Sequence, residues 1–143
     1  MKDAYSTYKT ANVDTADQGK LILIAYDVAI KHCKLALEKF KDRKLIEERT
    51  KHLYKVQDAI SELMGSLKLD VGEVARNLYR LYDYMLRRLV HANAKSESDC
   101  VKEVLGYLVE LRTAWSDAIQ SLRSQNSQTA SGDGQPQGIT VTG

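Results

Sequence analysis

Apolar residues recur every three or four positions through four long segments of this chain, and no proline interrupts them. The single proline among the 143 residues is Pro136, near the C-terminus. A spacing of three and four places side chains on one face of an α-helix, and that face must pack against other helices. The pattern therefore predicts an all-α protein, because no segment shows the alternation that is typical of a β-strand.

The four predicted helices cover about residues 15–40, 44–69, 73–95 and 99–122. Short connections between them make neighbouring helices antiparallel, so we expect an antiparallel up-down-up-down four-helix bundle over residues 15–123. The apolar stripe of the first helix is Ile22, Tyr26, Ala29, Cys33, Ala36 and Phe40, and that of the second is Ile46, Leu53, Val56, Ile60, Leu63 and Leu67, with Arg49 in one core position. The stripe of the third helix is Val74, Leu78, Leu81, Met85, Leu89 and Ala92. The stripe of the fourth is Val101, Val104, Leu108, Leu111, Trp115, Ala118 and Leu122.

The two ends of the chain do not follow this pattern. Residues 124–143 are rich in Gly, Ser and Gln and cannot bury enough apolar surface to become ordered, so we expect a disordered tail. Residues 1–14 are mostly polar but carry Tyr5 and Tyr8. Two tyrosines beside a bundle should dock on the bundle or on a partner, so we expect residues 1–14 to form a docking segment.

Composition excludes several classes of protein. The net charge of +2 is far from the strongly basic balance of a nucleic-acid-binding protein. No apolar run approaches the ~18 residues of a membrane span, and the N-terminus lacks the apolar core of a secretory signal. Cys33 and Cys100 match no metal-binding or redox spacing and are expected to be small buried side chains. These features predict a cytoplasmic protein without membrane insertion.

No arrangement of residues in the sequence predicts catalysis or metal binding. A di-iron bundle needs a glutamate three positions before a histidine on two helices. None of His32, His52 and His91 has such a glutamate. Zinc-protease, phosphate-loop, dinucleotide-binding and nucleophile-elbow motifs are also absent from the sequence. We therefore expect no enzymatic activity, no cofactor and no metal site.

A basic face on the third helix has two interpretations. Arg76, Arg80, Asp83 and Arg87 share this face, which could bind the phosphates of RNA or DNA. It could also be a solvated face on which Asp83 pairs with an arginine one turn away. The small net charge and the lack of alternating aromatic and basic residues favour the second interpretation.

Several stretches of the chain resemble the FliS family of flagellar secretion chaperones. The most specific is Asn77-Leu-Tyr-Arg-Leu-Tyr-Asp-Tyr-Met85, with Arg87-Arg88-Leu89 and Ala92-Asn93 after it. The others are Tyr5-Ser-Thr-Tyr8-Lys9, Val13-Asp-Thr15-Ala16, Gly19-Lys20-Leu21, Tyr26-Asp27, Glu103-Val104 and Leu111-Arg112-Thr113-Ala114-Trp115. They occur in the family's order and spacing over about residues 4–119.

The resemblance implies a flagellin-specific export chaperone of the cytoplasm. Such a chaperone binds the disordered C-terminal segment of flagellin, prevents premature polymerisation and helps deliver it to the flagellar type III export apparatus. The resemblance also implies that the position of Tyr5 docks on a component of the export gate. Neither a nucleotide nor a metal is required for this role.

Candidate partner-binding residues are the aromatic and apolar side chains of the N-terminal segment and of the first and third helices. They are Tyr5, Tyr8, Leu21, Ile24, Leu78, Tyr82, Met85, Leu86 and Leu89. The sequence leaves open which of them line an apolar groove and which belong to the core. The alternative function is a self-associating structural helical bundle, and a homodimer of the free chaperone is a further expectation.

Overall fold

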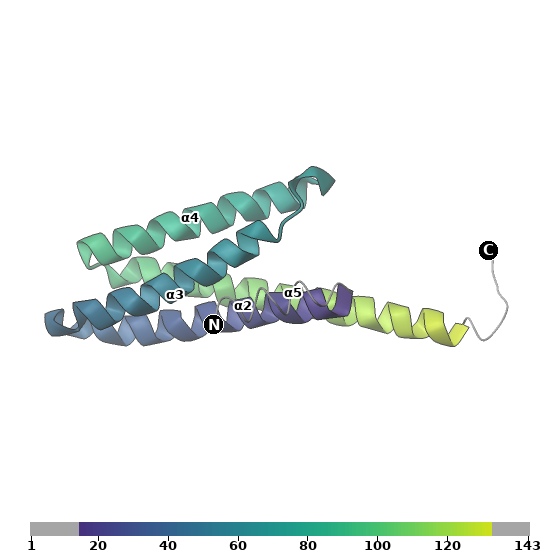
Figure 1. Cartoon of the computed structure of the whole chain (residues 1–143), viewed down its shortest axis with the longest axis horizontal. Coiled ribbons are helices and arrows are strands. Elements are labelled where there is room, and N and C mark those ends of the chain that lie inside the picture. The colour runs from purple at the N-terminus through teal and green to yellow at the C-terminus, as the bar shows by residue number, and fades with distance from the viewer. Residues whose placement is uncertain (1–14, 133–143) are drawn as a thin grey trace.

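The computed structural model of the chain describes residues 15–132 and contains four long α-helices (Figure 1). The long helices are α2 (Thr15–Glu38), α3 (Ile46–Gly65), α4 (Glu73–Lys95) and α5 (Ser98–Gly132). Three short 3-10 helices lie in the connections: η1 (Lys39–Lys41), η2 (Arg43–Leu45) and η3 (Leu69–Val71). No strand occurs in the described range, so the all-α prediction is confirmed for it.

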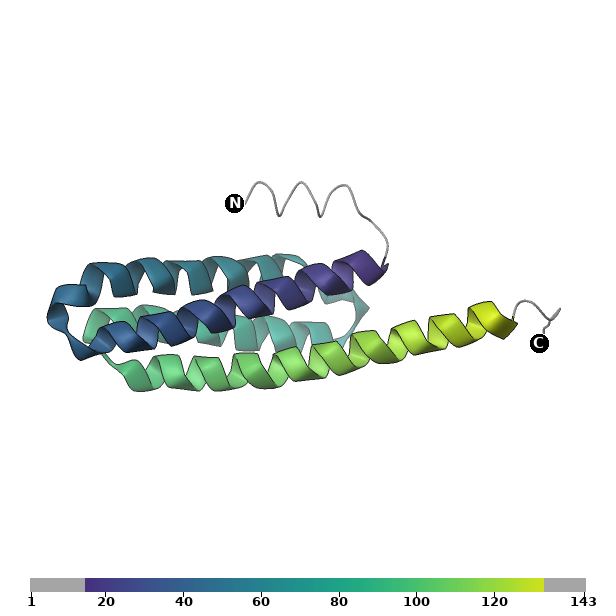
Figure 2. The ribbon, with the colours of Figure 1, turned by 90° about the horizontal axis from the view of Figure 1, so that it is seen from below.

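The long helices pack in a closed ring around one core. α2 packs against α3 and α5, and α4 packs against the same two helices (Figure 2). All four contribute fully buried side chains to a single cluster, such as Tyr26, Leu53, Met85 and Leu108. The arrangement is consistent with a four-helix bundle, in which each helix buries one apolar stripe.

Some predicted stripe residues are exposed: two lie at the starts of helices and two in the C-terminal half of α5. Val74, at the start of α4, is 74% exposed, and Ile46 and Leu122 are also exposed. Ala118, near Leu122 on α5, is exposed as well. The assignment of these residues to the core was wrong, because a spacing of three and four does not by itself place a neighbouring helix over every residue of a stripe.

Helix α5 is longer than the sequence pattern predicted. It continues to Gly132, whereas the pattern ended near Leu122 (Figure 2). The predicted end of the helix was based on the spacing of apolar residues. This spacing indicates where a helix packs against its neighbours, but a helix can continue beyond its last packed residue. Residues 116–131 contain neither glycine nor proline, so nothing in their backbone chemistry stops the helix before Gly132. The prediction of a disordered tail over residues 124–143 was therefore wrong for residues 124–132, which are helical. Residues 133–143 lie outside the described range.

Arg49 occupies a core position of α3, as the sequence predicted, and is only 3% exposed. Its Nε donates to Oδ1 of Asn93 at 3.0 Å, and its Nη2 donates to the Asn93 carbonyl oxygen at 3.1 Å. The guanidinium also lies over the ring of Phe40, 4.4 Å from its centroid. Nδ2 of Asn93 in turn donates to Oγ1 of Thr50 at 3.0 Å. This cluster ties α3 to the C-terminal part of α4.

Two histidines face each other between α2 and α3. Nδ1 of His32 lies 2.9 Å from Nδ1 of His52, so one ring donates and the other accepts. Burial, followed by the charges of His52, Lys31 and Lys55, lowers the pKa of His32 below its usual value. Protonation of both rings would remove the acceptor and place two positive charges in contact.

Acidification is therefore expected to destabilise the bundle through this pair. Because the folded-state pKa of His32 is lowered, the free energy of unfolding is highest above the unfolded pKa of about 6.5. It falls as the pH drops below that value, since the unfolded chain then binds the proton more readily. Urea denaturation between about pH 8 and about pH 5.5 measures this change. His32→Gln should flatten the dependence, and an unchanged slope in that variant would contradict the assignment.

The close approach of α2 to α5 predicts different results for two helical glycines. A Cβ added at Gly106 meets no described atom within 4 Å, so Gly106→Ala should raise the free energy of unfolding by roughly 0.8–1 kcal/mol through helix propensity. A Cβ added at Gly19 lies 3.0 Å from Cδ1 of Ile119, which offsets that gain. Urea denaturation of both variants checks this. Equal stabilisation by the two substitutions would show that α5 does not approach α2 so closely.

Candidate partner-binding surface

Three of the candidate residues on α4 lie inside the bundle. Tyr82, Met85 and Leu89 are all buried in the core cluster. Their spacing of three and four is that of the stripe that packs against the other helices. On α2, Leu21 is buried as well. All four side chains are therefore buried in the structure and are not part of the exposed surface described below.

A buried pair of tyrosine hydroxyls connects α2 to α4. The hydroxyl of Tyr26 is hydrogen-bonded to that of Tyr82, and both side chains are buried. Burial is the main cause that raises the pKa of both phenols. Both hydroxyls therefore stay neutral, so one can donate to the other. The pair satisfies two polar groups that would otherwise be costly in the core.

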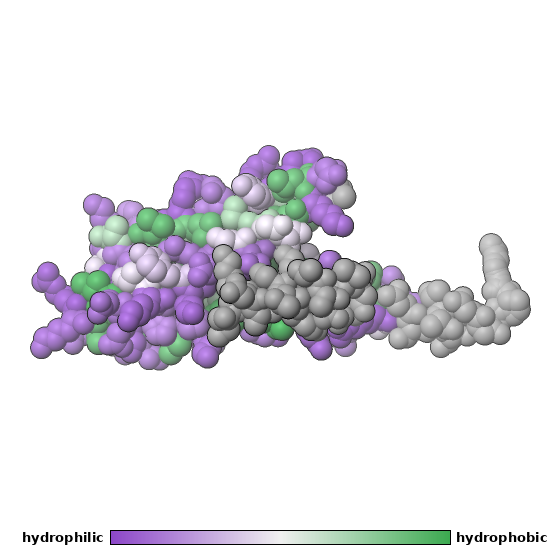
Figure 3. Space-filling model, viewed as in Figure 1, coloured by the Kyte–Doolittle hydropathy of each residue, from purple (hydrophilic) through white to green (hydrophobic). Residues whose placement is uncertain are grey.

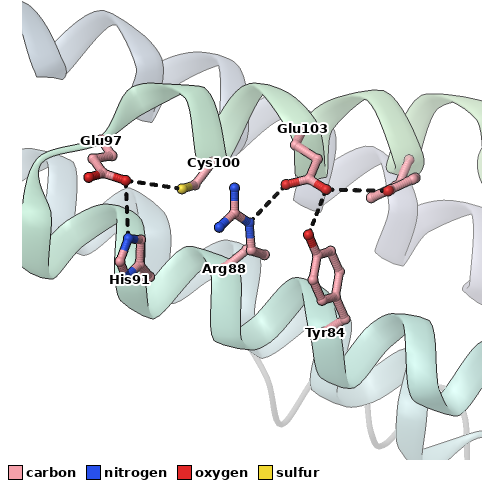
Figure 4. Close-up of polar contacts among 7 residues, drawn as sticks. Tyr84, Arg88, His91, Glu97, Cys100 and Glu103 are labelled. Carbon is pink, nitrogen blue, oxygen red and sulfur yellow. Dashed lines mark hydrogen bonds and ion pairs between the residues drawn. The ribbon is translucent and has the colours of Figure 1, made fainter.

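Polar contacts close the flank of α4 that faces α5 (Figure 4). Glu103 on α5 accepts hydrogen bonds from the hydroxyl of Tyr84 at 2.8 Å and from Nε of Arg88 at 2.8 Å. The hydroxyl of Tyr107 donates to the same carboxylate at 3.3 Å. The Tyr84 hydrogen bond, followed by Arg88, holds the pKa of Glu103 below its usual range. This side of α4 is thus occupied by contacts within the protein.

The opposite flank of α4 carries an exposed apolar strip, formed by Tyr79, Leu86 and Val90. Tyr79 is 40% exposed, Val90 is 57% exposed, and Leu86 is half-buried against the core. All three share a helix face with Asn93, since they precede it by 14, 7 and 3 positions. Asn93 contacts Thr50 of α3, so the strip lies on the α3 side of α4.

Exposed residues of α3 extend this surface. Tyr54 follows Thr50 by one helical turn, shares its face and is largely exposed. Figure 3 shows hydrophobic residues gathered along the border between α4 and α3. An aromatic ring beside the α4 strip gives a surface with apolar area and a polar hydroxyl, which is typical of protein interfaces.

Charged residues beside the strip are paired locally. Nε of Arg87 lies 3.2 Å from Oδ2 of Asp83, which confirms the predicted pairing within the basic face. Nη1 of Arg80 donates to Oδ1 of Asn77 at 2.8 Å, and Nη1 of Arg76 donates to the Leu69 carbonyl oxygen at 3.2 Å. Arg87 thus has an acidic partner, whereas Arg76 and Arg80 are hydrogen-bonded to neutral groups, and together they form a polar rim.

The remaining candidates are divided between the bundle surface and the undescribed N-terminus. Ile24 on α2 is exposed, and with Val28 one turn later it forms a smaller apolar patch. Leu78 on α4 is half-buried and packs against the core. Tyr5 and Tyr8 lie outside the described residues.

The sequence did not predict Tyr79, Val90 or Tyr54 for the surface along α4 and α3. It also did not predict Val28 for the patch on α2. The available signal was an apolar side chain that lies off the core stripe of its helix. In α4, Val90 is such a residue, because it follows Leu89 directly and points to a different face. The presence of a second, partial stripe beside the main one would have indicated an exposed apolar surface.

Comparison with known proteins decides the family. The family model described as "Flagellar protein FliS" matches residues 1–122. The chain belongs to the FliS family. The flagellar secretion chaperone FliS of Bacillus subtilis (strain 168) is 36% identical over 123 residues, covering 86% of this chain and 91% of the relative. The FliS protein of Vibrio cholerae is 28% identical over 123 residues, covering 80% of this chain and 88% of the relative.

Membership of the FliS family fixes the class of function. FliS proteins are flagellar secretion chaperones, so this chain is a chaperone of flagellum biogenesis and not an enzyme. The resemblance inferred from the sequence motifs is thereby confirmed. Among the described residues, none of the helices is both long enough and apolar enough to cross a bilayer.

Several of the described residues that carry the FliS resemblance form contacts between helices. Tyr26 pairs with Tyr82, Arg88 pairs with Glu103, and Asn93 binds Arg49. Arg112 of α5 forms an ion pair with Asp27 of α2. The family motifs therefore specify how the four helices fit together, and the exposed strip lies beside the motif residues on the same helix.

Proposed function

We propose that this FliS-family chain is a cytoplasmic, flagellin-specific export chaperone. It binds the disordered C-terminal segment of flagellin, prevents premature polymerisation and helps deliver flagellin to the flagellar type III export apparatus. The observation that carries the proposal is the exposed α4 strip on a bundle of this family. The proposal includes an up-down-up-down course of the helices, which the short connections favour.

The α4 strip suits a partner segment that folds as it binds. Its residues follow a spacing of seven and four along one helix, which matches the apolar face of an amphipathic helix laid beside it. A disordered segment must lose conformational entropy when it becomes helical, and burial of apolar side chains against the strip offsets this cost. The Asp83–Arg87 pair at the rim then stays in contact with water.

A titration of the full chain with a peptide of the flagellin C-terminal segment tests the proposal. Gel filtration should show a complex of fixed stoichiometry, and the peptide should gain helical circular dichroism. Flagellin that lacks this segment is the control and should not bind. If the chain forms oligomers that flagellin does not change, the exposed surface serves self-association and the chaperone proposal fails.

The N-terminal segment, residues 1–14, enters the proposal as a cap on the flagellin-binding surface. Its residues Tyr5 and Tyr8 would cover apolar area in the free protein and leave when flagellin arrives. Such a cap reduces the apparent affinity by the fraction of time that the surface is open. Deletion of residues 1–13 is therefore expected to tighten flagellin binding, or to leave it unchanged, and to increase dye binding.

A second role for Tyr5 can be separated from the cap. Because the family resemblance implies that Tyr5 docks on an export gate component, Tyr5→Ala should reduce flagellin export in cells more than it reduces flagellin binding in a titration. A truncated protein that stays folded but loses flagellin would show that residues 1–13 are part of the binding site, and the cap would then be excluded.

A further inference from the structure

Three donor groups of different chemistry meet where α4 ends and α5 begins. His91 lies in the last turns of α4, Glu97 in the connection, and Cys100 in the first turn of α5. Nε2 of His91 lies 3.1 Å from Oε1 of Glu97, and Sγ of Cys100 lies 3.8 Å from the same oxygen (Figure 4). All three donor atoms lie within 4.8 Å of one another. The flagellin-binding proposal uses none of these side chains.

The backbone of the turn holds the three groups in place. Ser96 adopts a left-handed conformation with φ of 55°, which reverses the chain after α4. The amide of Glu97 then donates to the Ala92 carbonyl oxygen at 3.0 Å, and the amide of Cys100 donates to the Glu97 carbonyl oxygen at 3.3 Å. Because both helices are fixed in the bundle, little chain entropy remains to be lost when the three groups bind one ligand.

We propose that His91, Glu97 and Cys100 bind one Zn²⁺ ion. Imidazole nitrogen, carboxylate oxygen and thiolate sulfur are the three donor types that zinc uses in proteins. Donor atoms around a tetrahedral zinc lie about 3.4–3.6 Å apart, by the usual metal–ligand lengths. The distances of 3.1 and 3.8 Å bracket this range. The third pair, Nε2 of His91 and Sγ of Cys100, lies within 4.8 Å, so the half-exposed His91 side chain has to move toward the thiol when the ion binds. A thiolate and a carboxylate balance the two charges of the ion.

Access and charge at the cluster also suit a cation. The side chains of His91 and Glu97 are about half exposed, whereas Cys100 is buried. Three protein ligands with one open side leave the fourth position to water or to a ligand from another molecule. Arg88 is the nearby positive charge, and its Nε is held by Glu103 at 2.8 Å. Zinc binding requires the thiol proton to leave, so the reaction is Zn²⁺ plus thiol giving zinc thiolate and a free proton.

The spacing explains why the sequence did not indicate this site. The histidine and the glutamate are separated by five residues, and the glutamate and the cysteine by two. The pattern differs from the paired-cysteine and paired-histidine spacings of common zinc motifs. It brings the donors together only because the chain reverses at Ser96.

Cobalt titration of the reduced, full-length chain tests the site directly. One equivalent of Co²⁺ should give a thiolate-to-cobalt charge-transfer band in the near ultraviolet, and Zn²⁺ should abolish it. Cys100→Ser should remove the band, and His91→Gln should weaken Co²⁺ binding roughly tenfold or more. Cys33→Ser, at the other and fully buried cysteine, is the matched control and should keep the band. His52→Gln, at a histidine outside the cluster, should also keep it.

Thermal unfolding provides a second test of zinc binding, which does not depend on the cobalt absorption band. Excess Zn²⁺ should raise the melting temperature of the original chain and of Cys33→Ser, but not of His91→Gln, whose exposed side chain is not needed for folding. Absence of the charge-transfer band in the original chain, or its persistence in Cys100→Ser, would overturn the proposal. The three residues would then form only a hydrogen-bonded cap between α4 and α5.

Discussion

Tyr82→Ala is expected to lower the free energy of unfolding by about 3–5 kcal/mol, the usual cost of truncating a large buried aromatic side chain. Tyr82 is fully buried on α4, and its hydroxyl pairs with that of Tyr26 on α2. The substitution removes the ring from the core and leaves the Tyr26 hydroxyl without its partner. Urea denaturation followed by circular dichroism measures the change.

A milder substitution separates the ring from its hydroxyl. Tyr82→Phe keeps the packing but removes the hydrogen bond between the buried Tyr82 and Tyr26 hydroxyls, at a cost of roughly 1–3 kcal/mol. Tyr54→Ala, on the exposed face of α3, is the control and should change stability by less than about 0.5 kcal/mol. If Tyr82→Ala kept its stability and lost flagellin instead, Tyr82 would belong to the binding surface, as the sequence alone allowed.

The helices were predictable because apolar spacing reports burial directly. Buried apolar residues, such as Leu53 in α3 and Val104 in α5, belong to rows spaced by three and four positions. Only the side of a helix that packs against the core requires this spacing. Even Arg49 was recognisable, because it interrupts an otherwise regular stripe. The end of α5 was not predictable in the same way, since helix propagation past Leu122 needs no apolar contacts.

The division of α4 between core and surface could not be read from its sequence. Leu86 and Val90 are as apolar as Met85 and Leu89 and lie directly beside them, so the helix is apolar over more than one face. Which face is covered depends on where α3 and α5 lie, and that follows from long-range packing. The candidate list therefore included core residues and omitted Val90.

Contacts between α4 and α5 depend on the register of the two helices. Glu103 meets Tyr84 and Arg88 because α5 starts only three residues after α4 ends. The same short turn brings His91 to Cys100. A shift of one residue along α5 would rotate Glu103 by about 100° away from α4. The spacing of apolar residues does not fix the register of two helices to one residue, so it cannot predict these pairs.

Val90→Asp is expected to weaken flagellin binding by about 2 kcal/mol or more, which is about a 30-fold increase in Kd. Val90 is exposed at the end of the α4 strip, so a carboxylate there would have to be desolvated beneath the partner's apolar face. Tyr79→Ala, at the other end of the strip, should weaken binding in the same direction. Val90→Asp should change the urea midpoint little, because Val90 is 57% exposed. Tyr79→Ala should lower it modestly, because Tyr79 is only 40% exposed.

Val74→Asp is the matched control for this experiment. It introduces the same carboxylate on the same helix at a residue that is 74% exposed, but 16 positions away and therefore on the opposite face. Isothermal titration with the flagellin peptide should leave its Kd near that of the original chain. Equal affinity for Val90→Asp and Val74→Asp would exclude the α4 strip. Flagellin binding would then have to be sought at the other exposed apolar patch, formed by Ile24 and Val28 on α2.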